Sequence, residues 1–570
     1  MVASRQHRIS IGTVADPNTR LGKRLRKLAP LLDRVLGIHK LDDFYQKHGL
    51  SGLSAADFAD QSLKALDVEV IGGDSLSQRL PKTGPVIIVS NHPHGGIEGL
   101  VLIKLLTALR PDSRILANFA LKVFPELESH FLFVNPLIPS DPANRTGLRK
   151  SLRHLQDDGV LVVFPAGRTS FYQDDLDCIA DSDWSRSVAT LARKSGASVM
   201  PIRFTGLNSP LFYRLGSVWY RFRLLMLARE LIKMRSRRIE VAVGAAAPTK
   251  KLLRYDDTEI TEMLRVLSAS LNMPVEQLER HQALEHAPLA AGRCGKTIQK
   301  EIEGLPRHQQ SVRAHGMVVG FARRAEIPEL TRQIMRDRER TFRLLDEGSG
   351  ESEDSDHFDD SYDHIFCWDE HNKALVGAYR VCRGRPAAEG EPTYLHSVFQ
   401  FENAFFENYN AALELGRSFI TPEYQRSRHA LDLLWRGIGS YLKAHPEFDA
   451  LYGTVSLTQQ YDSVSVQMMC DALIEPSSQV RPKFPLANRL PAEWYRFRRN
   501  QVIDLAKLNA LVSARETDGK GVPVLLRHYA GLGARFHAVG IDKQFADTPG
   551  LLLSVDLNQL PASKRKRYLT

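Results

Sequence analysis

The sequence has little cysteine, and its cysteines form no pattern. The 570 residues include five of them, Cys178, Cys294, Cys367, Cys382 and Cys470. The number is odd and no two form a C-x-x-C pair, so we expect neither a disulfide framework nor a zinc site. Unpaired thiols of this kind are typical of a cytosolic protein, and we predict that compartment.

Long hydrophobic runs are also missing. The first 20 residues contain no apolar core of the signal-peptide kind. No uninterrupted apolar stretch reaches the roughly 18–20 residues that a membrane-spanning helix needs. Any contact with a membrane is therefore expected to be peripheral. Internal repeats and long low-complexity segments are absent as well.

The length and composition that are present suit a large globular protein. With 570 residues, of which 43% are hydrophobic, the chain has enough apolar material for two or three domains. Its net charge of +10 fits nucleic acid, an anionic membrane or an acidic protein as a partner. The sequence contains no zinc fingers, RNP-like motif or helix-turn-helix, so we predict that it binds no nucleic acid.

The first part of the chain alternates between strand and helix patterns. Short apolar runs, read as buried strands, are separated by helical patterns such as 144–156. Alternation of this kind predicts an α/β domain, which we place at 80–273 after a basic helical region at 1–79. A helix at 258–271 would close it. The predicted strands are 85–90, 160–164, 198–204 and 239–243.

The second part has a different pattern. Residues 274–316 are polar and poorly periodic, and we predict a linker there. From 317 to 570 a helix at 329–345 is followed by an acidic loop, by strands, and then by a strand–helix–strand pattern. This order predicts an α+β domain. The predicted strands are 364–369, 374–381, 412–419 and 450–456, with a helix at 431–444.

A first candidate site lies in the segment NHPHGGIEG, where the strand 85–90 ends and a helix begins. Ligands of α/β sheets bind at the carboxyl ends of strands. His92 can act there as a general base, with Glu98 orienting and charging its imidazole. Gly95 and Gly96 would let backbone N–H groups approach the substrate. The alternative is that His92 and His94 only cap the helix and that Glu98 only occupies its first turn.

Two further motifs give this segment a context. FPAGRTS follows the strand 160–164, and MPIRFTG follows the next strand. Together with SNHPHGGIEG they resemble the ordered blocks of the glycerophospholipid acyltransferase family, over about residues 80–250. The resemblance implies acyl transfer from a thioester to a hydroxyl, with His92 as the base. Glu98 lies one position later than is usual in that family, as in the branch resembling lyso-ornithine-lipid acyltransferases.

The same resemblance places the acceptor at the FPAGRTS loop. It implies substrate contacts for Phe164, Pro165, Gly167 and Arg168. Ala166 replaces the glutamate of the family's loop, which argues against a glycerophosphate acceptor. Arg168 would instead pair with another anionic head group, or it is an ordinary solvated loop cation.

A second candidate site combines charged residues within the α+β pattern. Charges inside strand patterns need partners, so a buried network is expected. The alternative is a set of structural salt bridges beside a solvated acidic loop. The residues occur in the order R-x-x-x-F, D-x-F-D, a strand arginine and E-x-x-R. They are Arg338, Phe342, Asp356, Asp359, Arg380, Glu414 and Arg417.

In this order the motifs resemble the acyl-homoserine-lactone synthases, which have an acetyltransferase-like fold and acylate an amine from acyl carrier protein. Longer phrases, among them RERTFRLLDEGSG, LELGRSFITPEYQ and HYAGLGARF, resemble the ornithine lipid N-acyltransferase family over about 317–560. An amine must lose a proton when it attacks a thioester, and Glu414 is our candidate base or proton relay. Arg380 and Arg417 would pair with acidic side chains or with the amino acid's carboxylate.

Other members of the set allow more than one role. Asp356 and Asp359 would either attract a cationic amino acid or order Arg338. The segment QRSRHA lacks the glycines of a phosphate-cradling loop. We expect Arg426 and Arg428 to meet phosphopantetheine through charge.

Two basic stretches suit a surface role. RLGKRLRKLAPLLDRVLG starts at Arg20, and a second stretch from Arg214 adds Trp219, Tyr220 and Phe222. Basic amphipathic helices with aromatic residues suit an anionic lipid interface, and they would also suit acidic acyl carrier protein. The alternative is a pair of core-facing helices with a solvated polar side.

The whole chain resembles the fused, bifunctional ornithine lipid synthases of bacteria. The resemblance implies that the second domain acylates ornithine with a 3-hydroxyacyl group from acyl carrier protein. The first domain would then acylate the hydroxyl of lyso-ornithine lipid, at the inner face of the cytoplasmic membrane. We expect no metal and no bound cofactor. Alternatives are another amino acid, a lysophospholipid acyltransferase with a degenerate second domain, and a non-catalytic lipid-binding protein.

Overall fold

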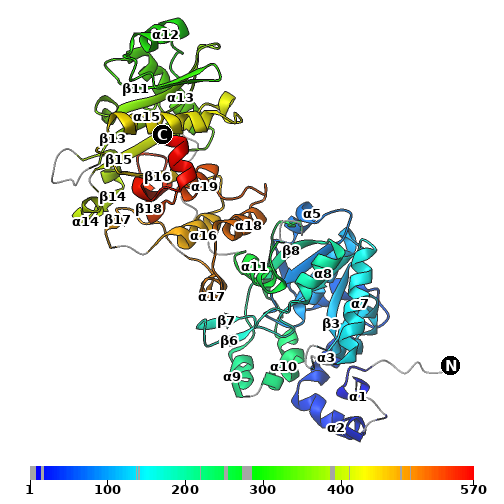
Figure 1. The fold of residues 1–570 in the computed structure, drawn as a ribbon. Coiled ribbons are helices and arrows are strands. Elements are labelled where there is room, and N and C mark those ends of the chain that lie inside the picture. The colour runs from blue at the N-terminus through cyan, green and yellow to red at the C-terminus, as the bar shows by residue number, and fades with distance from the viewer. Residues whose placement is uncertain are drawn as a thin grey trace. The chain divides into compact units, whose positions relative to one another are not determined.

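The computed structural model divides into two compact units (Figure 1). The first comprises Met1–Pro274 and Leu490–Gly521, and the second Val275–Arg489 and Val522–Thr570. The residues that it describes are 8–14, 18, 20–135, 138, 141–218, 220–248, 254–271, 286–384, 392–409, 411–475, 478–487 and 489–569.

The first unit is built on a seven-stranded sheet with the order β1-β9-β8-β2-β5-β3-β4. At its centre, β2 (Val86–Ser90) lies parallel to β5 (Val160–Val163) on one side and to β8 (Ser198–Phe204) on the other. Every residue of β2 is buried, as expected for a strand whose sheet is covered on both faces. Helices surround this sheet (Figure 1), so the predicted α/β class is confirmed.

The four predicted strands of this unit are present, and the sheet has further ones. Most of the strands that the sequence did not reveal are short or only partly buried, so their apolar pattern is weak. The predicted strand 239–243 is β9 (Arg238–Val243). The strands that the sequence did not reveal are β1 (Glu69–Ile71), β3 (Arg114–Asn118) and β4 (Phe131–Val134), with a separate hairpin of β6 (Phe171–Gln173) and β7 (Cys178–Ala180).

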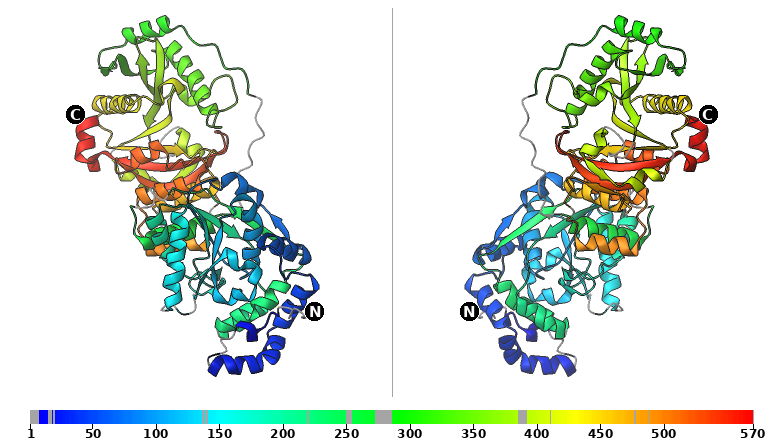
Figure 2. Two further views of the ribbon diagram at one scale, coloured as in Figure 1. Left: turned by 90° about the vertical axis from the view of Figure 1, so that its right-hand side faces the viewer. Right: turned by 90° about the vertical axis from the view of Figure 1, so that its left-hand side faces the viewer.

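Helices of the predicted basic region belong to the same unit. Phe58 and Leu63 of α4 share one core cluster with Val86 and Ile88 of β2. Figure 2 shows the blue helices α1 to α3 beside α10, and α3 contacts α10 directly. The helices before residue 250 are α1 (Ile11–Val14), α2 (Arg20–Val35), α3 (Ile38–Lys47), α4 (Ala55–Ala65), α5 (Asp74–Arg79), α6 (Ile97–Leu109), α7 (Pro142–Gln156), α8 (Ser187–Ser195), α9 (Pro210–Val218) and α10 (Tyr220–Ile232).

The domain prediction for 317–570 is wrong for one segment, because Leu490–Gly521 belongs to the first unit. Its helices α17 (Ala492–Asn500) and α18 (Leu505–Arg515) pack on α11 (Asp257–Ala269). Lys507 Nζ lies 2.7 Å from Glu259 Oε1, and Arg515 donates to the Ser270 carbonyl at 2.9 Å. The segment returns to the first unit because the apolar side of its charged helices needs a surface to cover, and α11 provides it.

The second unit has an eight-stranded sheet with the order β10-β11-β12-β13-β15-β16-β19-β18. Its neighbours are antiparallel except β15 (Ala412–Ile420) and β16 (Ala450–Ser456), which run parallel. Their pairing stops at Leu415 and Gly453, after which β15 continues along β13 and β16 along β19. The two parallel strands therefore separate within one sheet, and the predicted α+β class is confirmed.

Part of the predicted linker 274–316 belongs to the folded second unit. Helix α12 (Gly295–Gly304) buries Ile298 and Ile302 in the core, and β10 (Val312–Ala314) pairs with β11. The sequence concealed these elements because they are short and amphipathic. The others are β11 (Met317–Arg323), α13 (Pro328–Arg343), β12 (Asp363–Asp369), β13 (Ala374–Arg383), β14 (Phe399–Phe401), α14 (Asn403–Glu407), α15 (Ala430–Ala444), α16 (Ser463–Leu473), β17 (Val480–Pro482), α19 (Val524–Ala530), β18 (Arg535–Asp542), β19 (Thr548–Asp556) and α20 (Ala562–Tyr568).

No helix among the described residues is both long enough and apolar enough to cross a bilayer.

The returning segment generates a prediction about stability. Trp494 of α17 is completely buried, and replacing it with alanine should destabilise the first unit by about 3–5 kcal/mol, as for other large buried aromatics. Hydrogen exchange should then accelerate in α11 more than in the strands of the second unit. Val502→Ala, at an 84% exposed position of the same segment, is the control and should have no effect. Faster exchange confined to the second unit would contradict this assignment.

Candidate active sites

His92 lies in the short turn that joins β2 to α6. Two side chains hold this turn in place. The Asn91 amide donates to the Phe204 carbonyl at 2.9 Å and accepts from the Phe204 N–H at 2.8 Å, which ties the end of β2 to β8. The His92 N–H donates to the buried Asp181 at 3.3 Å. The histidine therefore stands on a rigid connection at the carboxyl edge of the sheet.

Glu98, in the first turn of α6, is completely buried. Its carboxylate accepts hydrogen bonds from the N–H groups of His94 at 2.6 Å, Gly95 at 3.1 Å and Gly96 at 3.0 Å. Its Oε1 lies 3.4 Å from Nδ1 of His92. Burial alone would raise the pKa of Glu98, but the charge of His92 and these donors lower it to about 2. The carboxylate is therefore ionised next to the imidazole.

The imidazole of His92 is positioned for proton transfer. Burial by itself would lower the pKa of His92. The Glu98 carboxylate outweighs burial, so the pKa of His92 lies above its usual value. The ring stacks on Phe164 with 4.4 Å between centroids and lines a cavity. Among the described residues, the buried Nδ1 faces only the Glu98 carboxylate and forms no other polar contact. This geometry suits a base oriented by a carboxylate better than a helix cap.

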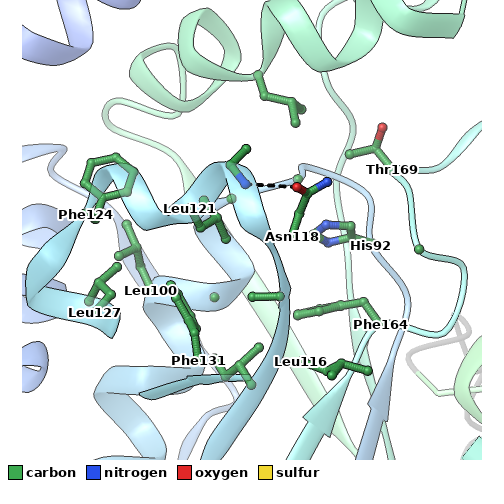
Figure 3. A pocket seen from close by; sticks show the side chains of 18 of the residues that line it. His92, Leu100, Leu116, Asn118, Leu121, Phe124, Leu127, Phe131, Phe164 and Thr169 are labelled. Carbon is green, nitrogen blue, oxygen red and sulfur yellow. Dashed lines mark hydrogen bonds between the residues drawn. The ribbon is translucent and has the colours of Figure 1, made fainter. Parts of the chain in front are cut away.

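The cavity beside His92 has a volume of about 790 Å³. Binding pockets of small ligands have roughly 300–1,000 Å³. Figure 3 shows His92, Asn118 and Thr169 toward one end, and apolar side chains extending away from them. A chamber with one polar end and an apolar interior suits an acyl chain whose reacting end lies at His92. The apolar lining includes Leu100, Leu121, Phe124, Leu127 and Phe131.

The residues predicted from the FPAGRTS loop also reach this cavity. Phe164, Pro165, Gly167 and Arg168 all line it. Arg168 is exposed, and its Nε donates to the Ser182 hydroxyl at 3.2 Å. The loop is thus placed where an acceptor would enter.

The expectation for the two glycines needs correction. Gly95 and Gly96 line the cavity, but their N–H groups donate to Glu98 instead of pointing to a substrate. A buried carboxylate takes the donors nearest to it, because an unsatisfied charge is costly. Gly95 has φ +93°, and a Cβ there would lie 2.6 Å from Leu227 and from Thr169.

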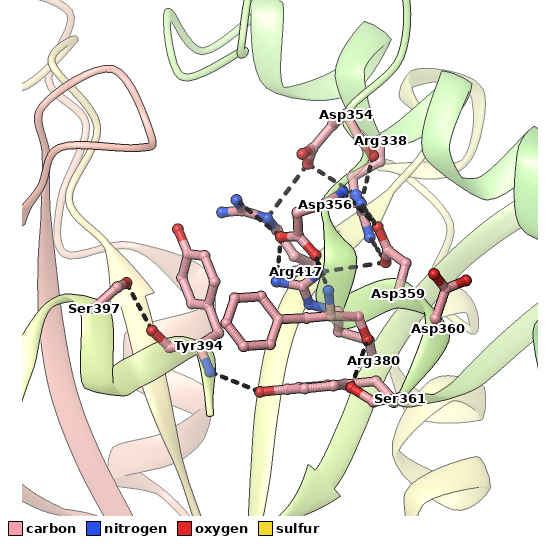
Figure 4. A network of polar contacts seen from close by, with 12 residues as sticks. Arg338, Asp354, Asp356, Asp359, Asp360, Ser361, Arg380, Tyr394, Ser397 and Arg417 are labelled. Atoms are coloured by element: carbon pink, nitrogen blue, oxygen red, sulfur yellow. Dashed lines mark hydrogen bonds and ion pairs between the residues drawn. The ribbon is translucent and has the colours of Figure 1, made fainter. Parts of the chain in front are cut away.

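In the second unit, the predicted charged residues form a buried network (Figure 4). Asp359 receives two hydrogen bonds from Arg338, at 3.0 and 2.9 Å, and one from Arg380 at 3.2 Å. Asp356 receives two from Arg380, at 2.6 and 2.8 Å. Burial by itself would raise the pKa of Asp359. The charge and hydrogen bonds of Arg338 outweigh burial, so the pKa lies well below its usual range. Both aspartates are therefore occupied in ordering arginines.

The network has two members that the sequence did not reveal. Asp354 Oδ2 lies 2.8 Å from Arg338 Nε and 3.4 Å from Arg417 Nε. The ring of Tyr394 lies 5.1 Å from the Arg380 guanidinium and 4.6 Å from that of Arg417. Asp354 was missed because it lies in an acidic run that resembles a solvated loop. Tyr394 carries no local signal, since it is brought in by a distant turn.

Phe342 and Arg417 meet through a shared aromatic partner. The Phe545 ring packs edge-on against Phe342 at 4.8 Å, and the Arg417 guanidinium lies 4.5 Å from it. Arg417 itself has φ +48°, where the register of β15 against β13 shifts. Phe342 thus supports the arginine from the core.

Glu414 is buried among aromatic rings, apart from solvent. The Tyr362 hydroxyl donates to its Oε1 and the Tyr452 hydroxyl to its Oε2, both at 2.8 Å. Burial raises the pKa of Glu414. The Tyr362 oxygen also accepts the Tyr394 N–H at 2.9 Å, which connects Glu414 to the arginine network. Because hydroxyl groups of Tyr362, Tyr452 and Thr393 surround the carboxylate, a proton would reach Glu414 through one of them.

Arg426 and Arg428 lie in the loop before α15. Both are exposed, and neither forms an ion pair within the described residues. They leave positive charge next to the N-terminus of a 15-residue helix, a place that suits a phosphate. No group of three or more His, Cys, Asp or Glu residues among those described is arranged to hold a metal ion.

Sequence reasoning also missed Glu347, which follows α13. Its side chain is completely buried and its Oε2 accepts a hydrogen bond from the Ser456 hydroxyl at 3.2 Å. Its Oε1 has no hydrogen-bond partner among the described residues. Ser456 is the last residue of β16, beyond the point where β15 and β16 separate. Burial raises the pKa of Glu347 to about 7, although Arg417 lowers it. It is thus an incompletely paired acid that titrates near neutral pH.

Replacing Glu98 with glutamine should lower the pKa of His92. The charge that raises this pKa would be gone, while the burial that lowers it would remain. NMR titration of the His92 ring would measure the change. Glu128→Gln, at an exposed carboxylate of the same unit, is the control. An unchanged pKa in the Glu98 variant would show that the two side chains are not coupled.

Glu347→Gln should change how stability depends on pH. The folded protein holds the Glu347 proton up to about pH 7, whereas the unfolded chain loses it near pH 4.5. Wild-type stability from this group is therefore lost as the pH rises through that window, and the variant should gain up to about 3 kcal/mol relative to wild type by pH 8. Denaturant unfolding at several pH values would measure it, with the exposed Glu351→Gln as control. A pH-independent difference would contradict the raised pKa.

Family models match part of each unit. A model described as "Acyltransferase" matches residues 16–245, and a model described as "Acetyltransferase (GNAT) domain" matches residues 338–436. Among solved structures, FeeM, an N-acyl amino acid synthase from uncultured soil microbes, aligns with 44% of this chain and 95% of its own, with a TM-score of 0.24 and 10% identity.

Individual relatives match each part of the chain. The lyso-glycine lipid O-acyltransferase of Bacteroides thetaiotaomicron is 30% identical over 208 residues, which are 34% of this chain and 71% of that protein. The glycine N(alpha)-acyltransferase of the same organism is 29% identical over 271 residues, 42% of this chain and 78% of its own. The L-ornithine N(alpha)-acyltransferase of Brucella abortus is 34% identical over 113 residues, 19% of this chain and 39% of its own. The chain therefore belongs to the lipid acyltransferases and joins an acyltransferase domain to an acetyltransferase (GNAT) domain, the composition of the fused ornithine lipid synthases.

Proposed function

We propose that this chain makes a diacylated aminolipid in two acyl transfers. The second unit transfers a 3-hydroxyacyl group from the thioester of acyl carrier protein to the α-amine of ornithine. The first unit then acylates the hydroxyl of that product. The observation that carries the proposal is the His92–Glu98 pair at the polar end of an apolar cavity, in a chain that also has a GNAT domain.

The O-acyl step follows from the first site. His92 takes the proton of the acceptor hydroxyl as its oxygen attacks the thioester carbonyl, and the imidazolium that forms is stabilised by the ionised Glu98. The carbon–sulfur bond then breaks, an ester forms, and the thiol leaves with a proton. The apolar cavity holds an acyl chain during the transfer and keeps water away from the thioester.

The N-acyl step belongs to the second unit. There the amine attacks the thioester, the carbon–sulfur bond breaks, and an amide and a free thiol result. The separation of β15 from β16 beyond Leu415 and Gly453 leaves backbone groups of both strands available to an extended donor arm. Arg426 and Arg428 would hold the phosphate of that arm. Glu414 would relay the amine's proton through Tyr362 or Tyr452.

Glycine is the second candidate for the amino acid. The relatives include N-acyltransferases named for glycine and for ornithine. Asp356 and Asp359, which would have attracted a cationic side chain, are occupied by Arg338 and Arg380. We propose ornithine as the amino acid because the longer motifs of this unit resemble those of ornithine lipid N-acyltransferases. A direct comparison of the two amino acids as acceptors in vitro decides between them.

Lipid analysis of a bacterial host that makes this chain tests both steps together. Wild type should give a diacylated aminolipid, and mass spectrometry identifies its amino acid. His92→Ala should slow the second step by roughly 10²–10⁴-fold, so that the monoacylated lyso-lipid accumulates. Glu414→Gln should remove both products, because its unit makes the lyso-lipid that carries the acceptor hydroxyl.

Two results of that analysis would count against the assignments. Normal diacylated lipid from His92→Ala would show that His92 is not the base. Normal lyso-lipid from Glu414→Gln would make the buried carboxylate purely structural. Glu407→Gln, an exposed glutamate of the same unit, serves as the matched control.

We also propose that the first unit works at the surface of an anionic membrane, on the cytoplasmic side. Helix α2 exposes Leu28 (52%) and Leu31 (63%) between basic residues. This combination suits shallow insertion with charge attraction. The basic stretch from Arg214 was expected to face the same surface, but Arg223 within it is buried and does not contribute. The side chains of Trp219 and Phe222 lie outside the described residues.

Vesicle binding tests this surface. The protein should sediment with anionic vesicles and be released by salt, because each basic residue near the surface contributes only about 1 kcal/mol and the attraction is screened. Leu28→Ser with Leu31→Ser should weaken sedimentation, and Val524→Ser, an exposed valine of the second unit, should not. Equal binding of all three proteins would remove α2 from the membrane contact.

A further inference from the structure

One buried cation of the first unit has no counter-charge. Arg223 of α10 is 7% exposed, and its Nη1 has no hydrogen-bond partner. Among the described residues no carboxylate forms an ion pair with it. Burial, and then the like charge of Arg168, lower the pKa of Arg223. A buried cation in this state is costly unless something anionic binds beside it.

The two arginines share one aromatic ring. The guanidinium of Arg223 lies 4.1 Å from the centroid of Phe171, and that of Arg168 lies 5.4 Å from it. Phe171 follows the FPAGRTS loop directly, so the loop that lines the cavity and helix α10 meet at this ring. The two guanidinium groups repel each other, and no acidic side chain among the described residues forms an ion pair with Arg223.

The neighbouring helix makes room for Arg223. A Cβ at Gly216 of α9 would lie 2.5 Å from Cγ and 2.6 Å from Cδ of Arg223. Glycine weakens the interior of a helix, yet here it lets the arginine side chain lie against α9. The position of the guanidinium is therefore built into two helices and is not the chance placement of a surface cation.

Arg223 is not itself among the residues that line the cavity, but its neighbours on α10 are. Leu224 and Leu227, which follow Arg223 on α10, line the cavity together with Arg168 and Thr169. Leu227 and Thr169 also meet at Gly95, three residues after His92. Figure 3 shows Thr169 and His92 at the same end. An anion held by the two arginines would therefore be near the base.

We propose that Arg223 and Arg168 bind the carboxylate of the amino acid head group of the lyso-lipid acceptor. This inference rests on the proposed function. In an N-(3-hydroxyacyl) amino acid, the carboxylate is only a few bonds from the hydroxyl that reacts, so both can be held at one end of the cavity. N-acylated glycine and N-acylated ornithine share this carboxylate, so the site serves either acceptor. The paired arginines thus replace the phosphate recognition that Ala166 argues against.

The test compares two acceptors in detergent micelles with a thioester donor. One is the N-(3-hydroxyacyl) amino acid, and the other is its carboxamide, which lacks the charge. Wild type should prefer the free carboxylate by roughly tenfold or more in kcat/KM, as expected for charge-assisted hydrogen bonds. Arg223→Met should lose most of this preference by raising KM for the carboxylate acceptor only. Arg229→Met, at an exposed position of the same helix, should keep it.

The outcomes separate this inference from the function on which it rests. If wild type acylates neither acceptor, the proposed function itself fails. If wild type acylates both equally, or if Arg223→Met keeps the preference, only the carboxylate site is wrong. A raised KM for the thioester donor with both acceptors would assign the anion to the donor's phosphate and overturn the proposal. Arg223→Lys, which keeps the charge, should retain part of the preference and guards against misfolding of the methionine variant.

Discussion

The buried carboxylate of Glu98 is the interaction on which the first site depends. An ionised carboxylate in the interior must be compensated, and here three backbone N–H groups and one imidazole do so. These partners come from a turn of five residues, so the conformation of the turn, the start of α6 and the position of His92 are all consequences of one charge. The same charge raises the pKa of the base, which links the geometry of the turn to its chemistry.

Compensation of buried charge also organises the second unit, with a different solution. Three arginines and three aspartates neutralise one another there, and hydroxyl groups satisfy Glu414. Against this background the incompletely paired groups stand out. Within the part of the chain that the structure describes, Glu347 keeps one carboxylate oxygen without a hydrogen-bond partner, and Arg223 forms no ion pair with an acid. Buried groups of this kind are where a substrate can supply the missing partner, because binding then recovers the cost of burial.

The two acyltransferase units are interleaved along the chain, since Leu490–Gly521 lies within the second half of the sequence but belongs to the first unit. Helices α17 and α18 cover α11, which closes the α/β sheet of that unit. A consequence is that a cut after residue 274 would leave α11 without this cover. The two activities are thus joined by shared architecture as well as by a single polypeptide.

The sequence by itself determined the fold class of each unit and predicted most of the residues that the structure brings together at the two candidate sites. Apolar runs of four to seven residues predict the central strands, and the His92–Glu98 pair is separated by only six positions. Both features can therefore be predicted because they depend on residues close together in the sequence. The tertiary structure alone decided which partners the buried charges take. Asp354 pairs with arginines of the network, the glycine N–H groups donate to Glu98, and Arg223 is buried. Each of these depends on residues from distant strands and helices, because a buried charge is satisfied by what packs around it, and local spacing carries no record of that.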